Sequence, residues 1–309
     1  MSFALRAVLA VMAAALLSAA VLRGDPPVDS KTEAEPPAYV RVPLVEGIPG
    51  PLFFETPTLA FVPKGTLRVT TGARFLAGVT LPASGLAGDL SELGMVRVDV
   101  GFGSRIEVRI QGAFRRHLRI DADRSRIRPP AAVTGQTTHD TGDFSFITLA
   151  QVMPERGLRP AVGLRVEAKL PNSNERRGIG TNTTDVLLSV PIQKQLGRLF
   201  VVSDLGLGIL TVPTDAQAQD DVLLYGLAAA WKASPRWMLS GELVGRWAPA
   251  GGHPGTGDRS SLRAGIAWMS GPNAVGLALS RGLVADEEDL GVMLAVSHGF
   301  RVHDRVRAD

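Results

Sequence analysis

The chain contains no cysteine, and this absence excludes both a disulfide framework and a lipid-modified N-terminal cysteine. After the first residues, no apolar run approaches the roughly 20 residues of a transmembrane helix. Aromatic residues make up only 6% of the chain, and the formal net charge is only +3. No Lys/Arg run carries interleaved aromatic residues, so we expect no nucleic-acid partner. The basic stretches 115–119 and 124–128 are interpreted as solvated loop faces, with contact to anionic lipid headgroups as the alternative.

The N-terminus has the pattern of an export signal. Arg6 is the only charged residue of the first 20, and the uncharged run Ala7–Leu22 follows it. Ser18-Ala19-Ala20 places small residues at positions −3 and −1 of a cleavage site. We therefore predict a secretory signal peptide over residues 1–20, with a retained N-terminal anchor helix as the alternative reading.

Residues 21–65 differ from the rest of the chain, because they are rich in proline. Proline removes backbone donors, so this stretch forms neither a helix nor a central strand. We expect a periplasmic segment that is flexible to about Glu35. The partly apolar piece from Pro43 to Pro63 either packs against the periplasmic end of the remaining structure or enters its interior, and the sequence leaves both placements open.

From residue 66 to residue 300, segments of about ten residues alternate apolar and polar side chains. Val98 and Val100, for example, share one face of such a segment, and Arg97 and Asp99 share the other. The predicted strands, about twelve in number, span residues 66–76, 94–103, 105–115, 143–153, 160–170, 184–195, 199–211, 221–233, 237–248, 261–269, 273–283 and 290–300. Nine residues, 301–309, form a C-terminal tail.

Strand length and connections favour a membrane barrel over a soluble sheet. Strands in soluble sheets average about five or six residues, whereas a tilted strand that crosses hydrocarbon needs about nine to eleven. Short turns alternate with long polar stretches such as 76–94, 116–142 and 213–220, as periplasmic turns and external loops do. The fold class predicted is a closed, antiparallel, up-and-down transmembrane β-barrel in an outer membrane. A soluble periplasmic β-sandwich is the less favoured alternative.

Two further features concern the surroundings of this barrel. Trp231, Trp237, Trp247 and Trp268 fall near strand ends, where an interfacial belt lies. The last strand alternates up to Phe300 and resembles the C-terminal assembly signal of outer-membrane barrels. The expected partners are outer-membrane lipid and lipopolysaccharide, the barrel-assembly machinery and a small solute that the sequence does not identify.

Charged residues of both signs occupy the polar faces of the strands. Those predicted to line the lumen are Arg97, Asp99, Glu107, Arg109, Arg165, Glu167, Lys169, Asp185, Asp204, Glu242, Arg246 and Arg263. Cross-strand neighbours lie about 5 Å apart, close enough to form ion pairs. Such residues either line a narrow aqueous pore with a slight anion preference, which we favour, or pair with one another and close it.

Within residues 159–212 a strand end leads into a glycine loop and then into the next strand, with the motifs Lys169-Leu170-Pro171, Gly178-Ile179-Gly180 and Thr184-Asp185-Val186. This stretch resembles the outer-membrane family named after the MetA pathway of phenol degradation. The resemblance implies a barrel that transports solutes, and it transfers no catalytic residue and no substrate.

The candidate chemistry of the sequence is sparse. The five histidines show no metal-ligand spacing, and no Gly-x-Ser-x-Gly motif occurs, so we expect neither an enzyme nor a cofactor. The function predicted is passive uptake of small solutes, including aromatic or other organic ones if the resemblance extends that far. The alternative is a non-transporting barrel with a structural or surface-binding role.

Overall fold

The computed structural model describes residues 54–301, except residues 82, 125–132, 134 and 250. Its elements are β1 (Thr66–Thr80), β2 (Leu86–Phe102), β3 (Ile106–Asp123), β4 (Thr137–Asp140), β5 (Ser145–Met153), β6 (Ala161–Lys169), η1 (Glu175–Arg177), β7 (Asp185–Leu196), β8 (Leu199–Val212), β9 (Asp215–Lys232), β10 (Trp237–Trp247), β11 (Arg259–Ser270), β12 (Asn273–Gly282) and β13 (Leu290–Arg301). The predicted signal peptide, the Pro-rich stretch up to residue 53 and the tail from residue 302 lie outside the described residues.

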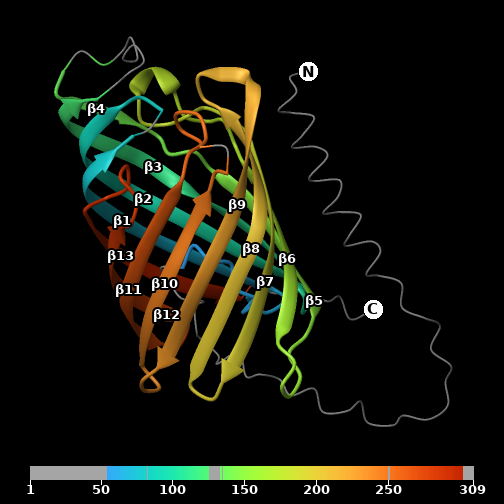
Figure 1. Ribbon diagram of the computed structural model, residues 1–309. Helices are drawn as coiled ribbons and strands as arrows, with labels where there is room; N and C mark the ends of the chain where they lie inside the picture. Colours follow the sequence, from blue (N-terminus) through green and yellow to red (C-terminus); the bar gives the residue numbers. More distant parts are fainter. Residues whose placement is uncertain (1–53, 82, 125–132, 134, 250, 302–309) are drawn as a thin grey trace, which may run out of the picture. The chain divides into compact units, whose positions relative to one another are not determined.

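The strands form one antiparallel sheet that closes on itself. The strand β2 pairs with β1 on one side and with β3 on the other, which joins the two ends of the sheet. Of the thirteen strands described, β4 pairs only with β3, so twelve strands complete the ring (Figure 1). The strands β1 and β13 pair from Thr66↔Arg301 to Ala77↔Leu290. The predicted closed antiparallel barrel of about 12 strands is confirmed.

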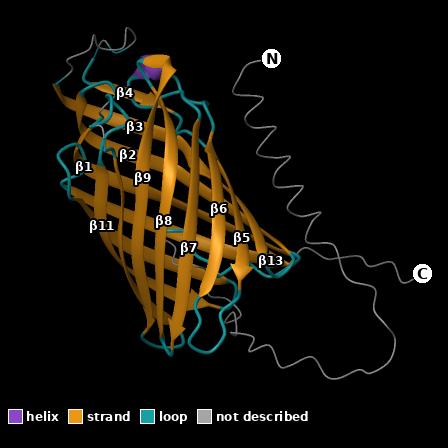
Figure 2. Cartoon of the chain, turned by 45° about the vertical axis from the view of Figure 1, so that its right-hand side comes forward, coloured by secondary structure: helices purple, strands orange, loops and turns teal. Residues whose placement is uncertain are grey.

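The two ends of the barrel differ in their connections, as the sequence predicted. At one end, called here the short-turn end, the connections include residues 103–105, 197–198 and 271–272. At the other, called here the long-loop end, they include residues 170–184 and 248–258 (Figure 2). The short-turn end is the periplasmic end in barrels of this class.

Three of the predicted long loops are wrong in extent, because strands continue into them. The predicted loop 76–94 is a hairpin in which β1 ends at Thr80 and β2 begins at Leu86. Most of the predicted loop 116–142 belongs to β3 and β4, and β9 begins at Asp215 within the predicted loop 213–220. Beyond the hydrocarbon both faces of a strand can be polar, so the alternation disappears from the sequence while the backbone ladder continues.

The barrel wall is apolar on its outside and small or polar on its inside. Leu277, Leu279 and Leu294 are 45%, 51% and 53% exposed, whereas Ala278 and Ala295 on the opposite face are buried. A soluble protein of this size would not expose such a continuous apolar band. A closed ladder inside an apolar band is the arrangement that a lipid bilayer requires, so the described chain is an outer-membrane β-barrel.

Tryptophan side chains mark the edge of this band. Trp231, Trp237 and Trp268 are all exposed at the short-turn end, with Trp237 directly opposite Trp268 in the ladder. Trp247 is exposed at the far end of β10. These positions fit an interfacial belt. Among the described residues, no helix is long and apolar enough to cross a membrane.

Pro191 lies inside β7 without the bulge that its missing N–H predicts. The register between β6 and β7 is the same before and after it, as Val162↔Ile192 and Arg165↔Ser189 show. On the other side, Pro191 pairs with Asp204 of β8. The ladder with β6 has no pair at Pro191, so a local gap rather than an extra residue accommodates the proline.

The orientation of the wall predicts opposite outcomes for arginine at two exposed leucines. Leu277 lies midway along β12, and Leu158 lies in a turn at the short-turn end, where it is 96% exposed. We expect Leu277→Arg to lower the free energy of unfolding in lipid vesicles by about 2–4 kcal/mol and Leu158→Arg by about 0–1 kcal/mol. Denaturant unfolding measures both, and equal effects of the two changes would contradict the membrane placement of β12.

Candidate functional site in the barrel interior

The residues predicted to line the lumen all lie on the inner face of the wall. They are Arg97, Asp99, Glu107, Arg109, Arg165, Glu167, Lys169, Asp185, Asp204, Glu242, Arg246 and Arg263, and each is buried or half-buried, whereas most of their large apolar neighbours along the strands are exposed. Glu107 and Glu242 as whole residues are only 1% and 2% exposed. A carboxylate beside a wide aqueous channel would be far more exposed, so the interior around these residues is filled.

Cross-strand ion pairs join these charges at several levels. Near the short-turn end, Arg109 donates from Nε to Asp99 at 2.6 Å and from Nη2 to Glu107 at 2.9 Å. On β6, Arg165 pairs with Glu167 and, from Nη1, lies 3.7 Å from Asp204 of β8. These contacts correspond to the second of the two arrangements considered from the sequence, in which the charged residues pair with one another.

Residues 54–63, called here the lumenal segment, account for the filled interior. Phe54, Thr56, Leu59 and Val62 are 3%, 1%, 6% and 1% exposed, and their contacts come from strands all around the wall. The segment leads inward from the start of β1 and appears in blue within the ring of strands (Figure 1). Of the two placements that the sequence left open, the interior is the one observed for these residues.

The wall holds the lumenal segment by side-chain contacts to its backbone. Glu242 accepts hydrogen bonds from the backbone N–H groups of Glu55 and Thr56. Gln193 accepts one from Leu59 N–H at 2.6 Å, and Glu107 accepts one from Val62 N–H at 2.9 Å. The segment forms no strand of its own, so these bonds replace a backbone ladder.

Three wall glycines make room for the lumenal segment. A Cβ atom at Gly101 would lie 2.2 Å from the carbonyl oxygen of Val62. A Cβ at Gly163 would lie 2.4 Å from the Leu59 side chain, and one at Gly226 would lie 3.2 Å from the Thr56 Cβ. The inner wall is therefore shaped to this segment at three positions along its length.

The lumenal segment also explains the apolar residues on the inner face of β5. Ile147 and Leu149 point inward and are almost fully buried in a cluster with Leu59 and Phe61. The sequence of this strand is apolar on both faces, which a water-filled lumen does not explain. Its inner face contacts the lumenal segment and its outer face contacts lipid.

Halfway along the barrel, a second charged cluster surrounds Glu55. Arg263 donates from Nη2 to Glu55 Oε1 at 2.6 Å, and Arg74 Nη1 lies 3.7 Å from the same oxygen. Arg74 also pairs with Glu92, which Arg116 shares. Glu55, Glu92 and Arg116 were not among the predicted lumen residues, because Glu92 and Arg116 fall in predicted loops and Glu55 in the Pro-rich stretch.

The charges of this cluster control the protonation of Glu55. Enclosure within the barrel raises the pKa of its carboxyl group, an effect limited by the 50% exposure of the side chain, and Arg263 and Arg74 outweigh it and lower the pKa to about 2. Glu55 is therefore ionised at neutral pH and in mildly acidic solution.

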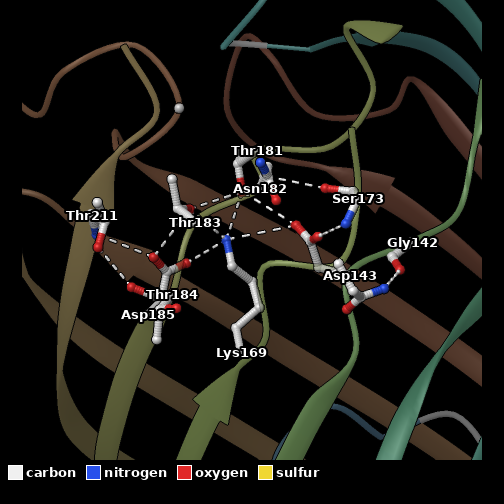
Figure 3. Close-up of polar contacts among 12 residues, drawn as sticks. Gly142, Asp143, Lys169, Ser173, Thr181, Asn182, Thr183, Thr184, Asp185 and Thr211 are labelled. Atoms are coloured by element: carbon white, nitrogen blue, oxygen red, sulfur yellow. Dashed lines mark hydrogen bonds and ion pairs between the residues drawn. The ribbon is translucent and has the colours of Figure 1, made fainter. Parts of the chain in front are cut away.

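A polar network at the long-loop end fixes the connection between β6 and β7 (Figure 3). Lys169 Nζ lies 2.6 Å from Asp185 Oδ2 and donates to the hydroxyl groups of Thr181 and Thr183 at 2.7 and 3.1 Å. The same ammonium group is 3.8 Å from Asp143. These residues include the Lys-Leu-Pro and Thr-Asp-Val positions of the resemblance described above, and their contacts here hold a loop in place.

The fixed loop also contacts the hairpin between β1 and β2. Ser84, between β1 and β2, donates to the carbonyl oxygen of Gly178 at 2.7 Å, and Arg116 donates to that of Ile179 at 3.2 Å. The Ile179 side chain packs in a buried apolar cluster with residues of β1, β2 and β3. The loop between β6 and β7 thus folds inward across part of the barrel mouth.

The loop between β10 and β11 also turns inward. Arg246 donates to the carbonyl oxygens of Gly255 and Gly257, both at 2.9 Å. A Cβ at Gly255 would lie 2.7 Å from Pro213 and 3.3 Å from Ala83, so this loop touches the hairpins β8–β9 and β1–β2. The described loops therefore cover the long-loop end from two sides.

One histidine, in the loop between β10 and β11, contacts an aspartate. His253 Nδ1 lies 2.9 Å from Asp220, but the Thr256 hydroxyl donates to the same aspartate rather than to the imidazole. This is not the order of contacts by which a base activates a nucleophile. Within residues 54–301, as far as they are described, no group of three His, Asp or Glu side chains is placed to hold a metal ion.

Comparisons with known proteins concern the fold. The chain is similar to the KdgM porin in complex with disordered oligogalacturonate, at 4% identity and a TM-score of 0.45 over 76% of this chain and 99% of that one. It is similar to the NanC porin at 8% identity and a TM-score of 0.46, over 75% and 98% of the two chains. For the outer membrane channel DcaP of Acinetobacter baumannii the identity is 12% and the TM-score 0.33, over 76% and 72%. No protein-family model and no curated protein matches the chain.

The low pKa of Glu55 predicts how its contribution to holding the segment depends on pH. Because the folded-state pKa lies below the ordinary value of 4.5, the contribution is fully present above that value and is lost as the pH falls toward about 2. We expect the difference in the free energy of unfolding between the parent chain and Glu55→Gln, measured by denaturant unfolding in lipid vesicles, to stay constant from about pH 8 to about pH 5 and to vanish only well below about pH 4. A difference that disappears near neutral pH would contradict the assignment.

Proposed function

We propose that this protein is an outer-membrane channel for small solutes whose path is closed by the lumenal segment and opens when that segment leaves. The observation that carries the proposal is the mode of attachment. The segment occupies the interior but belongs to no strand, and wall side chains rather than a backbone ladder bind it. It can therefore leave without breaking the sheet that closes the barrel.

The apolar contacts set how often the segment leaves unaided. Phe54, Leu59, Phe61 and Val62 are all nearly fully buried. Full burial of such side chains is worth about 1.5–3 kcal/mol each, or roughly 6–12 kcal/mol together. Each 1.4 kcal/mol is about a factor of ten, so spontaneous opening is rare and the closed state is the resting state.

The resemblance of residues 159–212 to the family named after the MetA pathway supports transport and suggests small aromatic compounds as cargo. In this proposal the outward leucines contact outer-membrane lipid and lipopolysaccharide, and the alternating last strand is presented to the barrel-assembly machinery. Secretion by the signal peptide of residues 1–20 belongs to the same proposal.

A non-transporting barrel is the second candidate function. The buried apolar anchors of the segment and the two inward loops at the long-loop end favour it, because both would suit a permanently filled barrel. The experiments that follow separate the two functions.

Removing the apolar anchors should open the channel. We expect the triple variant Phe54→Ala, Leu59→Ala and Phe61→Ala to raise the fraction of time spent conducting by at least about tenfold, since each truncation removes more than 1.4 kcal/mol of burial. Single-channel recording of the full chain in a planar bilayer measures this fraction. Leu158→Ala removes an exposed leucine that does not touch the segment and should change nothing. A folded triple variant that stays silent would favour the non-transporting barrel.

A reversible cross-link should close the opened channel again. The chain has no cysteine, and a Cβ at Gly226 would lie 3.2 Å from that of Thr56, slightly under the usual disulfide spacing of about 3.5–4.5 Å. We expect Thr56→Cys with Gly226→Cys, added to the triple variant, to lower the current on oxidation and to restore it on reduction. Each single cysteine variant serves as the control. If the current is the same in the oxidised and reduced protein, the segment is not the gate.

A further inference from the structure

Phe54 and Glu55 of the lumenal segment are adjacent in the chain but occupy two different kinds of surroundings. Phe54 is 3% exposed within an apolar cluster, whereas the Glu55 side chain is 50% exposed and its carboxylate meets guanidinium groups. An aromatic body and a carboxylate are thus held side by side in the middle of the barrel.

The surroundings of Phe54 are unusual for the inside of a membrane barrel, which is ordinarily polar. The cluster that buries it comes from the inner faces of β8 to β13 and consists of Val202, Ala228, Ala230, Met238, Ala267, Met269, Ala274, Ala278, Met293 and Ala295. Small alanines leave space, and methionines adapt to irregular shapes. Among the described residues of the cluster, Phe54 alone does not belong to the wall.

Three guanidinium groups of the wall converge on oxygen atoms of these two residues. Arg263 donates to Glu55 Oε1 at 2.6 Å, and Arg74 lies 3.7 Å from it. Arg97 Nη2 donates to the carbonyl oxygen of Phe54 at 3.2 Å. Arginine is the side chain best suited to grip a carboxylate, because its planar fork offers parallel donors.

Departure of the lumenal segment would remove one carboxylate from this level of the barrel. Arg74 would keep Glu92, which Arg116 shares, and Arg263 would keep Glu242 at 3.5 Å. Both Arg74 and Arg263 would lose their contact with Glu55. Another anion at the position of Glu55 would restore these contacts, since hydrogen bonds from guanidinium groups to carboxylates are among the stronger ones.

We infer that Arg74, Arg97, Arg263 and the alanine–methionine cluster form a binding site for a small aromatic carboxylate, which Phe54 and Glu55 occupy in the closed state. The inference rests on the proposed gating function and names its substrate class. A ligand with both groups replaces the apolar and the ionic contacts of the segment together. A neutral aromatic compound or a small aliphatic acid replaces only one of the two.

The test uses benzoate as the probe. Benzyl alcohol, which has the aromatic ring but no carboxylate, and acetate, which has a carboxylate but no ring, are compared with it. Vacating the site with Phe54→Ala and Glu55→Ala in the full chain should tighten benzoate binding by at least about tenfold, because the competing occupant is gone. Benzyl alcohol and acetate should each bind at least about tenfold more weakly than benzoate to this variant. Calorimetric titration of the folded protein in detergent measures the three affinities.

Two controls distinguish the site from general partitioning. Lys64→Ala, at an exposed position just after the segment, should bind benzoate as the parent chain does. The oxidised Thr56→Cys and Gly226→Cys variant, with Phe54 and Glu55 intact, holds the segment in place and should not bind benzoate, whereas its reduced form should. Benzoate should also raise the conductance of the parent chain and of the reduced variant but not of the oxidised one.

The outcomes separate this inference from the gating proposal. If benzoate binds the vacated variant no better than benzyl alcohol or acetate does, the inference is wrong. A redox-dependent current would in that case still establish the gate. A current independent of the cross-link would overturn the gate, and with it the claim that the ligand opens the channel. Preferential benzoate binding that is lost in the oxidised form establishes the site.

Discussion

A lipid bilayer offers no hydrogen-bond partners to a backbone, and this constraint determines the rest of the structure. The sheet must close, and it does so where β2 joins β1 to β3. Closure turns one face of every strand outward to lipid and the other inward. The large apolar side chains therefore go outside, and the interior receives the small residues and the charges. The contents of the interior then determine whether a solute can pass through the barrel.

Here residues 54–63 of the chain itself occupy the interior. The inner charges pair across strands, as Arg109 does with Asp99 and Glu107, but they also bind the backbone of residues 54–63. Glu242 shows the link most clearly, because one carboxylate faces Arg263 and accepts two N–H groups of the segment. The charges that a channel would use to attract solute thus hold the segment in place.

Much of the barrel could be predicted from the sequence, because the bilayer imposes an alternation that is visible residue by residue. The inward position of Arg97, Glu107 or Glu242 follows from that alternation alone. The sections of β2, β3 and β9 nearest the long-loop end were not predicted as strand, because polar residues occupy both faces there. The position of residues 54–63 had no periodic signal, and its partners, such as Glu242, lie nearly two hundred residues away.

Indirect signals of the filled lumen were nevertheless present. Ile147 and Leu149 put apolar side chains on a face expected to be wet, and Gly101, Gly163 and Gly226 remove side chains from the inner wall. Each became interpretable only with the segment in place, since a glycine on an inner face is equally compatible with a wide pore.

The fit between wall and segment argues for a closed state that is specific rather than a collapsed lumen. A collapse would bring wall side chains against one another, whereas here the glycines at 101, 163 and 226 leave space that only a chain between them fills. The same fit leaves the sheet intact, because the bonds from Gln193 and Glu107 to the segment come from side chains. Exchange of the segment for another occupant therefore costs the wall no ladder hydrogen bond. The occupant has to match an apolar patch beside a cluster of arginines, and the wall presents both whether residue 54 or a solute lies between them.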